Sequence, residues 1–292
     1  MRHVGVEIEF MGLTANAAAD ALARDLGGSI SSEDPHAFRI NGTRIGNLLV
    51  ETDLRYAHPA RYPNLRLRLP PRAAAWLGTL VEPFVPRELI TVPLPVARLP
   101  EVDAAVASLQ AAGARGRGVV LWDALGLHFN IDPPSLDAET VTAYLKAFLL
   151  LSDHFRGAIA RGRRRLALIL PPDYPHDYKR LVLHPDYRPS VADLTRDYLA
   201  ANPTRRRALD LLPLLAHFDR ERVRSLLPHE KIGPRPVFHY RLPLAYPGDP
   251  AWSILPDWSR WLDVERLASD TERLAAMARD ALSRSARFPP PI

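Results

Sequence analysis

The chain has 292 residues, of which 47% are hydrophobic and 24% are charged, and its formal net charge is +5. This is the composition of a globular protein with a substantial core, and no apolar run reaches the ~18–20 residues of a membrane span. The absence of cysteine excludes disulfides, thiolate metal sites and cysteine nucleophiles. The first residues lack the segments of a secretory signal, so we expect a cytoplasmic protein.

The positive charge does not by itself indicate a nucleic-acid partner. Of the 38 basic residues only three are lysines, at positions 146, 179 and 231. Such a preference for arginine, together with abundant alanine, leucine and proline, is typical of genomic base composition rather than of a binding surface. We therefore expect neither a nucleic-acid nor a membrane partner, and the sequence is silent on oligomeric state.

The first half of the chain predicts strands separated by helices. A strand over residues 4–10 is followed by a helix over 14–26, which Thr14 can cap and the two glycines after Leu26 can end. Asn41-Gly42 predicts a hairpin turn between two extended segments. Three further elements are predicted before residue 113: a helix over 72–81, a strand over 89–92 and a helix over 101–112.

The second half is predicted to be mostly helical. A strand centred on His128 precedes a long helix over 136–160, and the proline-rich residues 171–189 resemble an ordered loop or lid. The remaining elements predicted are helices over 191–200, 204–215, 220–226 and 264–283, and a strand over 235–242. Strands separated by helices of irregular length indicate an α+β fold with an antiparallel-rich sheet.

Polar side chains alternate with apolar ones along four of the expected strands. Because successive side chains of a strand point to opposite faces, Glu7 and Glu9 share one face of the first strand, whereas Val4, Val6, Ile8 and Phe10 share the other. The same alternation places Glu51 with Asp53, His128 with Asn130 and Asp132, and Arg235 with His239 and Arg241.

Two carboxylates on a strand usually belong to a solvated face, so Glu7 and Glu9 alone are weak evidence of a site. Neighbouring like charges lower stability unless they are compensated, and a magnesium ion held by carboxylate oxygens would compensate them. Polar side chains on three other strands make a functional face the better interpretation. The sequence contains no Gly-x-x-x-x-Gly-Lys-[Ser/Thr] phosphate loop and no Gly-x-Ser-x-Gly elbow.

These motifs, in this order, resemble the amidoligase family of carboxylate–amine ligases, which is related to glutamine synthetase and glutamate–cysteine ligase. The resemblance rests on residues 5–10, on Glu51-x-Asp53, on Gly126-x-His128-x-Asn130, and on the segments 202–214 and 235–241. It implies one catalytic domain over residues 1–292 with a helical C-terminal extension at about 250–285. The implied fold is a largely antiparallel curved sheet, a funnel or half-barrel, flanked by helices.

The resemblance also implies ATP and magnesium ions at the mouth of the sheet, and a role for each polar residue. The implied metal ligands are Glu7, Glu9, Glu51, Asp53, His128 and His239. The implied nucleotide contacts are Arg235, Arg241, His128, Asn130 and Lys231. The implied catalytic residues are Arg241 and Arg235, which would hold the phosphates, and Asp132 as a base for the amine.

One position departs from the related enzymes. Glutamine synthetase has a glutamate two residues before its last-strand arginine, where this chain has His239. Histidine is a poorer ligand for magnesium than a carboxylate, so one metal would be bound more weakly or replaced by manganese.

The implied reaction forms an amide through an acyl phosphate, on a glutamate-type or peptide carboxylate. Two alternatives stay open at this point: a metal-dependent phosphohydrolase, which would use the same acids and histidines, and an inactive binding protein of the same fold. The identities of the acid and of the amine do not follow from the sequence.

Overall fold

The computed structural model describes residues 1–62, 69–116, 125–160, 170–230 and 232–287, and the chain forms two compact units. Residues 1–131 and 242–255 belong to the first unit, and residues 132–241 and 256–292 belong to the second. Each unit is described by itself. The expectation of a single catalytic domain stays a prediction.

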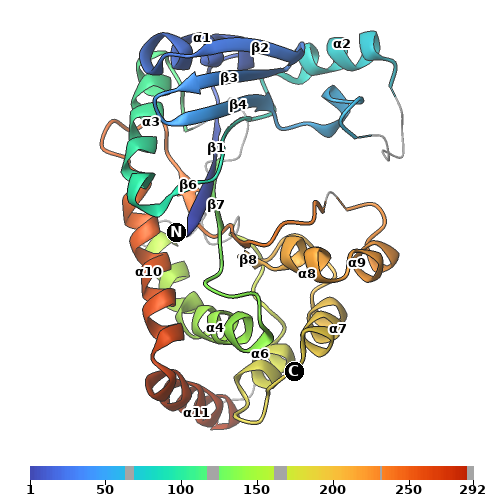
Figure 1. Ribbon diagram of the computed structural model, residues 1–292, viewed down its shortest axis with the longest axis vertical. Coiled ribbons are helices and arrows are strands. Elements are labelled where there is room, and N and C mark those ends of the chain that lie inside the picture. The colour runs from blue at the N-terminus through green and yellow to red at the C-terminus, as the bar shows by residue number, and fades with distance from the viewer. Residues whose placement is uncertain (63–68, 117–124, 161–169, 231, 288–292) are drawn as a thin grey trace. The chain divides into compact units, whose positions relative to one another are not determined.

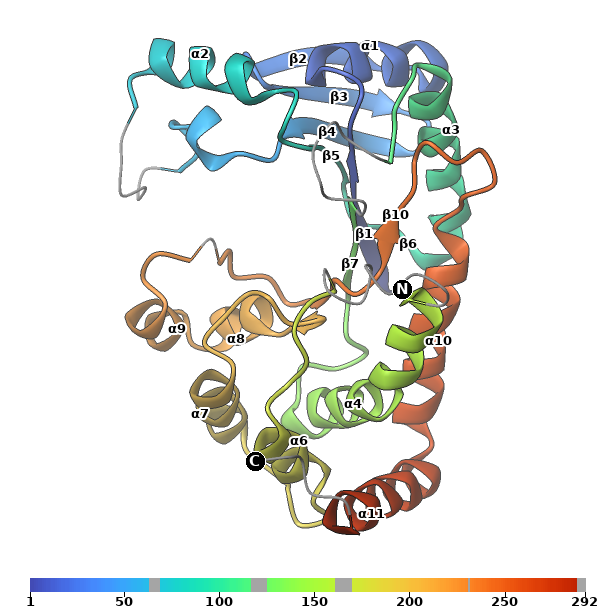
Figure 2. The ribbon, with the colours of Figure 1, turned by 180° about the vertical axis from the view of Figure 1, so that it is seen from behind.

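The first unit contains an open antiparallel sheet. Its strands lie in the order β2 (Ser29–Asp34), β3 (Ala37–Thr43), β4 (Gly46–Thr52), β5 (Arg87–Thr91), β1 (His3–Phe10) and β7 (Leu125–Ile131). Two short strands extend it, since β6 (Leu94–Pro95) pairs with β1 and β10 (Leu244–Ala245) pairs with β7. Figure 2 shows β5 next to β4, with β1 and β7 beyond it. The predicted α+β class with a large antiparallel sheet is confirmed.

Helices border this sheet: α1 (Ala15–Leu26), α2 (Pro71–Val81) and α3 (Val102–Ala111), with 3-10 turns at η1 (Arg55–Ala57) and η2 (Val96–Glu101). Helix α1 contacts β2, β3 and β4 on one side and α3 on the other (Figure 1). Its start is fixed as predicted, because the Thr14 hydroxyl accepts a hydrogen bond of 3.0 Å from the backbone N–H of Ala17.

The apolar face of β1 is fully buried. Val4, Val6, Ile8 and Phe10 all have 0% exposure, and they alternate with the polar residues as the sequence predicts. Burying four such side chains is worth about 1.5–3 kcal/mol each, which fixes the direction in which the polar side chains of the strand point. The register of β1 thus positions Glu7 and Glu9.

The predicted hairpin turn at Asn41-Gly42 is wrong. Both residues lie inside β3, and the chain turns at Arg44 and Ile45. Gly42 has φ 74°, and the pairing of β3 with β4 shifts register between Ile40 and Thr43. The Asn-Gly pair therefore lies at an irregularity within the strand rather than in a turn, and glycine readily adopts the left-handed conformation found there. Strand β2 was not predicted.

The second unit is mainly helical. Its helices are α4 (Ala138–Ala160), α6 (His176–Leu183), α7 (Val191–Ala201), α8 (Leu212–Phe218), α9 (Arg220–Leu226), α10 (Leu255–Ser269, whose first residue still belongs to the first unit) and α11 (Thr271–Arg287). Strands β8 (Leu209–Asp210) and β9 (Phe238–Tyr240) pair with each other. Aromatic rings join α4, β9 and α10, with centroids of Tyr144 and Phe238 5.0 Å apart and those of Tyr240 and Trp261 5.5 Å apart.

Four predicted elements of the second unit differ from the structure. The segment 171–189 contains helix α6, which follows Pro175, and the helix predicted over 204–215 is replaced by β8 and α8. Strand β9 has only three residues because Pro236 cannot donate to a strand ladder. The last predicted helix is two helices, since Asp270 ends α10 and its side chain caps α11 at Arg273.

Among the described residues, no helix is both long enough and apolar enough to cross a membrane.

Candidate metal centre

Three glutamates form a row across neighbouring strands of the first unit. In the antiparallel register Glu88 of β5 is directly opposite Glu9 of β1 on one side and Glu51 of β4 on the other. Residues directly opposite each other share a face and have Cβ atoms about 4.5–5.5 Å apart. The carboxylates of the three strands are therefore gathered by the pairing of the strands alone.

Glu88 is the most enclosed of these acids. Its side chain is buried at 7% exposure, and Glu51 is buried at 2%. Burial is the largest cause that raises the pKa of Glu88 well above its usual range, and the negative charges of Glu7, Asp53, Glu9 and Glu51 raise it further. Because four carboxylates act on the buried Glu88, this position favours either a bound proton or a nearby cation.

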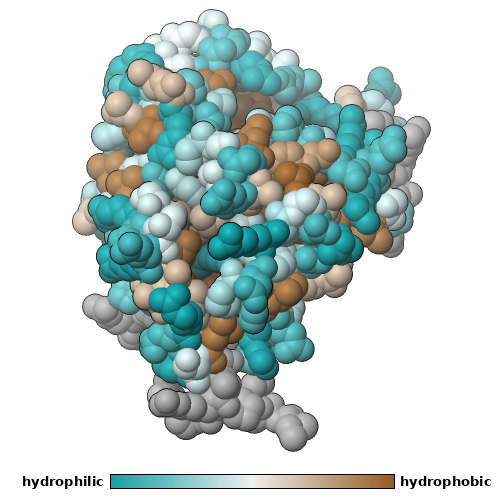
Figure 3. Space-filling view, turned by 60° about the horizontal axis from the view of Figure 1, so that its bottom comes forward, coloured by the Kyte–Doolittle hydropathy of each residue, from teal (hydrophilic) through white to brown (hydrophobic). Residues whose placement is uncertain are grey.

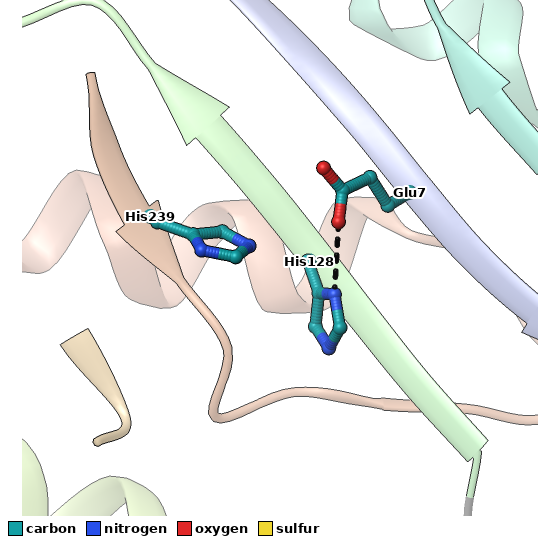
Figure 4. A group of neighbouring side chains, drawn as sticks. All are labelled: Glu7, His128 and His239. Atoms are coloured by element: carbon teal, nitrogen blue, oxygen red, sulfur yellow. Dashed lines mark hydrogen bonds and ion pairs between the residues drawn. The ribbon is translucent and has the colours of Figure 1, made fainter. Parts of the chain in front are cut away.

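Glu7 extends the cluster towards β7. It is directly opposite His128, and the Nδ1 atom of His128 lies 3.1 Å from one oxygen of its carboxylate (Figure 4). The side-chain amide of Asn130 donates a hydrogen bond of 2.8 Å to the other oxygen. In a neutral imidazole that donates from Nδ1, Nε2 carries the lone pair, which is the form that binds metals.

Gly126 allows the side chains of β1 and β7 to approach the backbone. Its N–H donates a hydrogen bond of 2.7 Å to Glu9. A Cβ atom at this position would lie 2.6 Å from Nε2 of His128 and 3.1 Å from a carboxylate oxygen of Glu9. The space that a side chain would fill is thus used by two residues of the cluster.

The other edge of the cluster lies at the end of β4. Glu51 forms an ion pair with Arg61, whose guanidinium also lies 3.7 Å from Glu33. Asp53 is exposed one residue beyond the end of β4, where its charge still raises the pKa of Glu88. Arg61 thus provides positive charge beside the glutamate row.

A buried histidine holds the segment between Asp53 and Arg61 against the sheet. The Nδ1 atom of His58 lies 2.7 Å from the Asp34 carboxylate, and its Nε2 lies 2.8 Å from the backbone carbonyl of Thr52. Both partners can only accept, so the ring is doubly protonated in this arrangement. Burial lowers the pKa of His58, but the hydrogen bonds and charge of its partners outweigh burial and raise it overall.

The remaining predicted residues belong to the second unit. His239 is buried on β9, and its Nδ1 lies 3.6 Å from the carboxylate of Asp210 on β8. Arg235 and Arg241 flank β9 and are half-buried. Asp132, also half-buried, is the first residue after β7, and Lys231 lies outside the described residues. Their roles stay predictions.

Two residues of the cluster were not predicted. Glu88 precedes the segment 89–92, for which a strand was predicted, and extending that strand by one residue would have placed it opposite a polar face. Arg61 comes from a proline-rich segment without periodicity, so no sequence signal identifies it.

The donor set fits a hard divalent cation. Glu7, Glu9, Glu51, Asp53 and Glu88 offer carboxylate oxygens, the ligands that magnesium prefers, and His128 offers a nitrogen that manganese also accepts. Burial, and after it the charges of four neighbouring carboxylates, raises the pKa of Glu88. A divalent cation is the ligand that such a cluster can hold in place of a proton.

Comparisons with known proteins agree with the motifs. Neither the curated proteins nor the solved structures contain a match to this chain. The model of a family described as "Putative amidoligase enzyme" matches residues 1–263, which include both the glutamate row and strand β9. The chain therefore belongs to the amidoligase family.

Proposed function

We propose that the protein is an ATP- and magnesium-dependent carboxylate–amine ligase. In the first step an oxygen of the substrate carboxylate attacks the γ-phosphorus of ATP, the bond to the β,γ-bridging oxygen breaks, and ADP leaves. In the second step the amine nitrogen attacks the acyl carbon, phosphate leaves, and the nitrogen loses a proton to a base. The products are an amide, ADP and phosphate.

The observation that carries this proposal is the glutamate row of the first unit. Glu88 and the four carboxylates around it, in a chain of the amidoligase family, offer the oxygen ligands that magnesium prefers. Glu7, Glu9, Glu51, Asp53 and Glu88 would divide between the metal ions rather than surround a single one, with His128 as a further ligand. The bound cation would neutralise charge on the transferring phosphoryl group.

Arg235, Arg241 and Lys231 are proposed to bind the phosphates, on the strength of their places in the family motifs. The planar fork of arginine can donate two parallel hydrogen bonds to one phosphate, and it keeps its charge at every physiological pH. Asp132 is proposed as the base for the amine. In the second unit, the carboxylate of Asp210 lies 3.6 Å from Nδ1 of His239, and a small approach would let it orient the ring by a hydrogen bond, as carboxylates do for metal-binding histidines.

The test measures metal binding and turnover separately. Titration with Mn²⁺, followed by electron paramagnetic resonance, should give affinities that fall about tenfold or more in Glu9→Gln and Glu88→Gln, because each removes a charged ligand. Glu101→Gln is the matched control, since Glu101 is exposed and pairs with Arg98 instead. A screen of amino acids, peptides and amines should then give ADP only when an acid and an amine are both present.

Each possible result has a distinct meaning. Unchanged Mn²⁺ affinity in both glutamine variants would refute the metal centre. ATP or phosphoester cleavage that needs neither acid nor amine would replace the ligase by a phosphohydrolase. Tight binding of metal and ATP without turnover on any pair would favour an inactive binding protein.

A further inference from the structure

The second unit contains a pocket of about 500 Å³ that the proposed reaction does not use. All residues that line it belong to this unit, and they come from α4, from the end of α6 and the segment after it, and from α11. On the face shown in Figure 3, hydrophilic and hydrophobic side chains are interspersed. The residues that line the pocket include charged, polar and apolar side chains, a combination that can bind and orient a small molecule.

The α4 wall presents polar and charged groups in a helical pattern. Glu139, Thr142, Ala143 and Lys146 lie at positions i, i+3, i+4 and i+7, so they share one face of the helix. Glu139 and Lys146 are about 10 Å apart along the helix axis at 1.5 Å per residue. The negative charge therefore lies at one end of this wall, and the positive charge lies at the other.

The other two walls combine apolar surface with further positive charge. Leu183 is the last residue of α6 and Arg188 lies in the segment that follows it, whereas Leu274, Ala278 and Arg279 come from one face of α11. The three cations and the one carboxylate of the lining leave a net charge of +2. Among the residues that the structure describes, neither Arg188 nor Arg279 forms an ion pair.

Lys146 is held at the cationic end of the pocket. Its ammonium group donates hydrogen bonds of 3.3 Å to the backbone carbonyls of His184 and Tyr187, which keep it against the segment that carries Arg188. Burial and, secondarily, the nearby charge of Arg188 lower the pKa of Lys146. Two cations are thus kept close together, an arrangement that an anion would relieve.

A buried hydroxyl group adds an independent observation. Thr142 is only 5% exposed, and its hydroxyl has no hydrogen-bond partner within the described part of the chain. An unpaired buried hydroxyl costs about 1–3 kcal/mol. Thr142 lines the pocket one helical turn from Lys146 on the same face of α4, so a turn of its side chain would bring the hydroxyl to a ligand oxygen that also contacts Lys146.

We propose that this pocket binds a small carboxylate with an apolar body, such as an N-acylated amino acid. The carboxylate contacts Lys146 and Arg188 and accepts a hydrogen bond from Thr142, while the apolar part packs against Leu274 and Ala278. Glu139 disfavours ligands that carry several negative charges. This site is additional to the metal centre and does not depend on it.

The experiment uses the full-length protein without metal or ATP, titrated calorimetrically with N-acetyl-L-leucine. N-Acetyl-L-leucinamide has the same apolar body without the charge. Its affinity should be lower by a factor of about ten or more, because charge-assisted hydrogen bonds are roughly twice as strong as neutral ones. Inorganic phosphate, which has the charge without the apolar body, should also bind more weakly.

Variants locate the binding. Lys146→Met and Arg188→Gln should each weaken N-acetyl-L-leucine about tenfold. Ala275→Leu, at an exposed position of the α11 wall, should weaken binding by narrowing the pocket while preserving the helix. Arg180→Gln, an exposed arginine of α6 outside the pocket, is the matched control and should leave affinity unchanged. Circular dichroism confirms that each variant is folded.

Three results would overturn the proposal. The first is no measurable binding of N-acetyl-L-leucine to the unaltered protein. The second is equal affinity for N-acetyl-L-leucine and its amide, or tighter binding of phosphate. The third is an affinity that is unchanged in folded Ala275→Leu, which would place the ligand elsewhere. Loss of the ligase reaction in a glutamate variant bears only on the metal centre, so the two proposals fail separately.

Discussion

In the first unit, Glu9, Glu88 and Glu51 stand on three adjacent strands that bring their carboxylates together. In the second unit, Lys146, Arg188 and Arg279 come from two helices and a connecting segment, and line a pocket. Both regions concentrate charges of one sign, but Glu88 is buried whereas Arg188 and Arg279 are exposed. The repulsion between like charges should therefore lower the free energy of unfolding strongly in the first region and only weakly in the second.

The largest expected loss of metal affinity in the acidic region comes from adding a side chain at Gly126. In Gly126→Ala the new Cβ would have to displace His128 and Glu9, so the affinity for Mn²⁺ should fall about 10–100-fold, as for the loss of a group that orients metal ligands. Electron paramagnetic resonance titration measures this. Gly157→Ala is the control, because a Cβ there meets nothing within 4 Å. Equal affinities in the two variants would show that the close approach at Gly126 is irrelevant to the metal.

His58 tests whether the segment beside Glu51 is held by charge. Its folded-state pKa is raised, so its contribution to stability should be complete below the unfolded value of about 6.5 and should be lost as the pH rises through the folded value. Near pH 6, His58→Gln should lower the free energy of unfolding by about 2 kcal/mol, since hydrogen bonds to charged groups contribute about 1.5–3 kcal/mol.

Urea unfolding between pH 5.5 and 8.5 measures this difference, which should shrink towards the alkaline end. His154→Gln, at an exposed position of α4, should be neutral throughout. A difference for His58→Gln that stayed constant over this range would mean that the ring is held without its second proton.

Replacing Glu88 can distinguish the destabilisation caused by the acidic cluster from its contribution to metal binding. The raised pKa means that Glu88 contributes stability below its unfolded value and that this contribution is lost as the pH rises through the folded value. At pH 8, without metal, Glu88→Gln should therefore raise the free energy of unfolding by about 1 kcal/mol, the equivalent of somewhat less than one pKa unit.

The same substitution should reverse its effect when metal is added. Saturating Mn²⁺ should stabilise the unaltered protein more than Glu88→Gln, because ligands stabilise the state that binds them. Thermal unfolding with and without the ion checks both halves. A destabilised variant in the absence of metal would show that Glu88 is compensated by contacts rather than repelled by its neighbours.

The two regions also differ in how far the sequence reveals them. Alternation along β1 is a period-two pattern, and it correctly placed Glu7 and Glu9 opposite the buried Val6 and Ile8. Glu88 was missed because the predicted strand began one residue too late, and strand ends are where propensity is least informative. Arg61 depends on the hydrogen bonds of His58, and nothing local in the sequence encodes them.

The pocket is hidden from the sequence for a different reason. Glu139, Thr142 and Lys146 show the helical spacing, but the same spacing describes any solvated face of a long helix. The pocket exists only because α11 and the segment after α6 lie against α4, and the break at Asp270 that positions α11 was not predicted. Packing between helices, rather than any motif, creates this site.

The smallest expected effect is on stability when Arg188 is replaced. Arg188→Gln should change the free energy of unfolding by less than about 0.5 kcal/mol, as for most surface substitutions. Its effect should appear instead at Lys146, whose lowered pKa should rise when the neighbouring charge is removed, although burial continues to lower it.

The chain has only three lysines, so the ammonium titrations can be followed individually by NMR with labelled lysine. Lys179, which pairs with Asp173, serves as the internal reference. If the pKa of Lys146 did not change in Arg188→Gln, the two cations would not interact. The pocket would then lack the concentrated positive charge that distinguishes it from an ordinary helix surface.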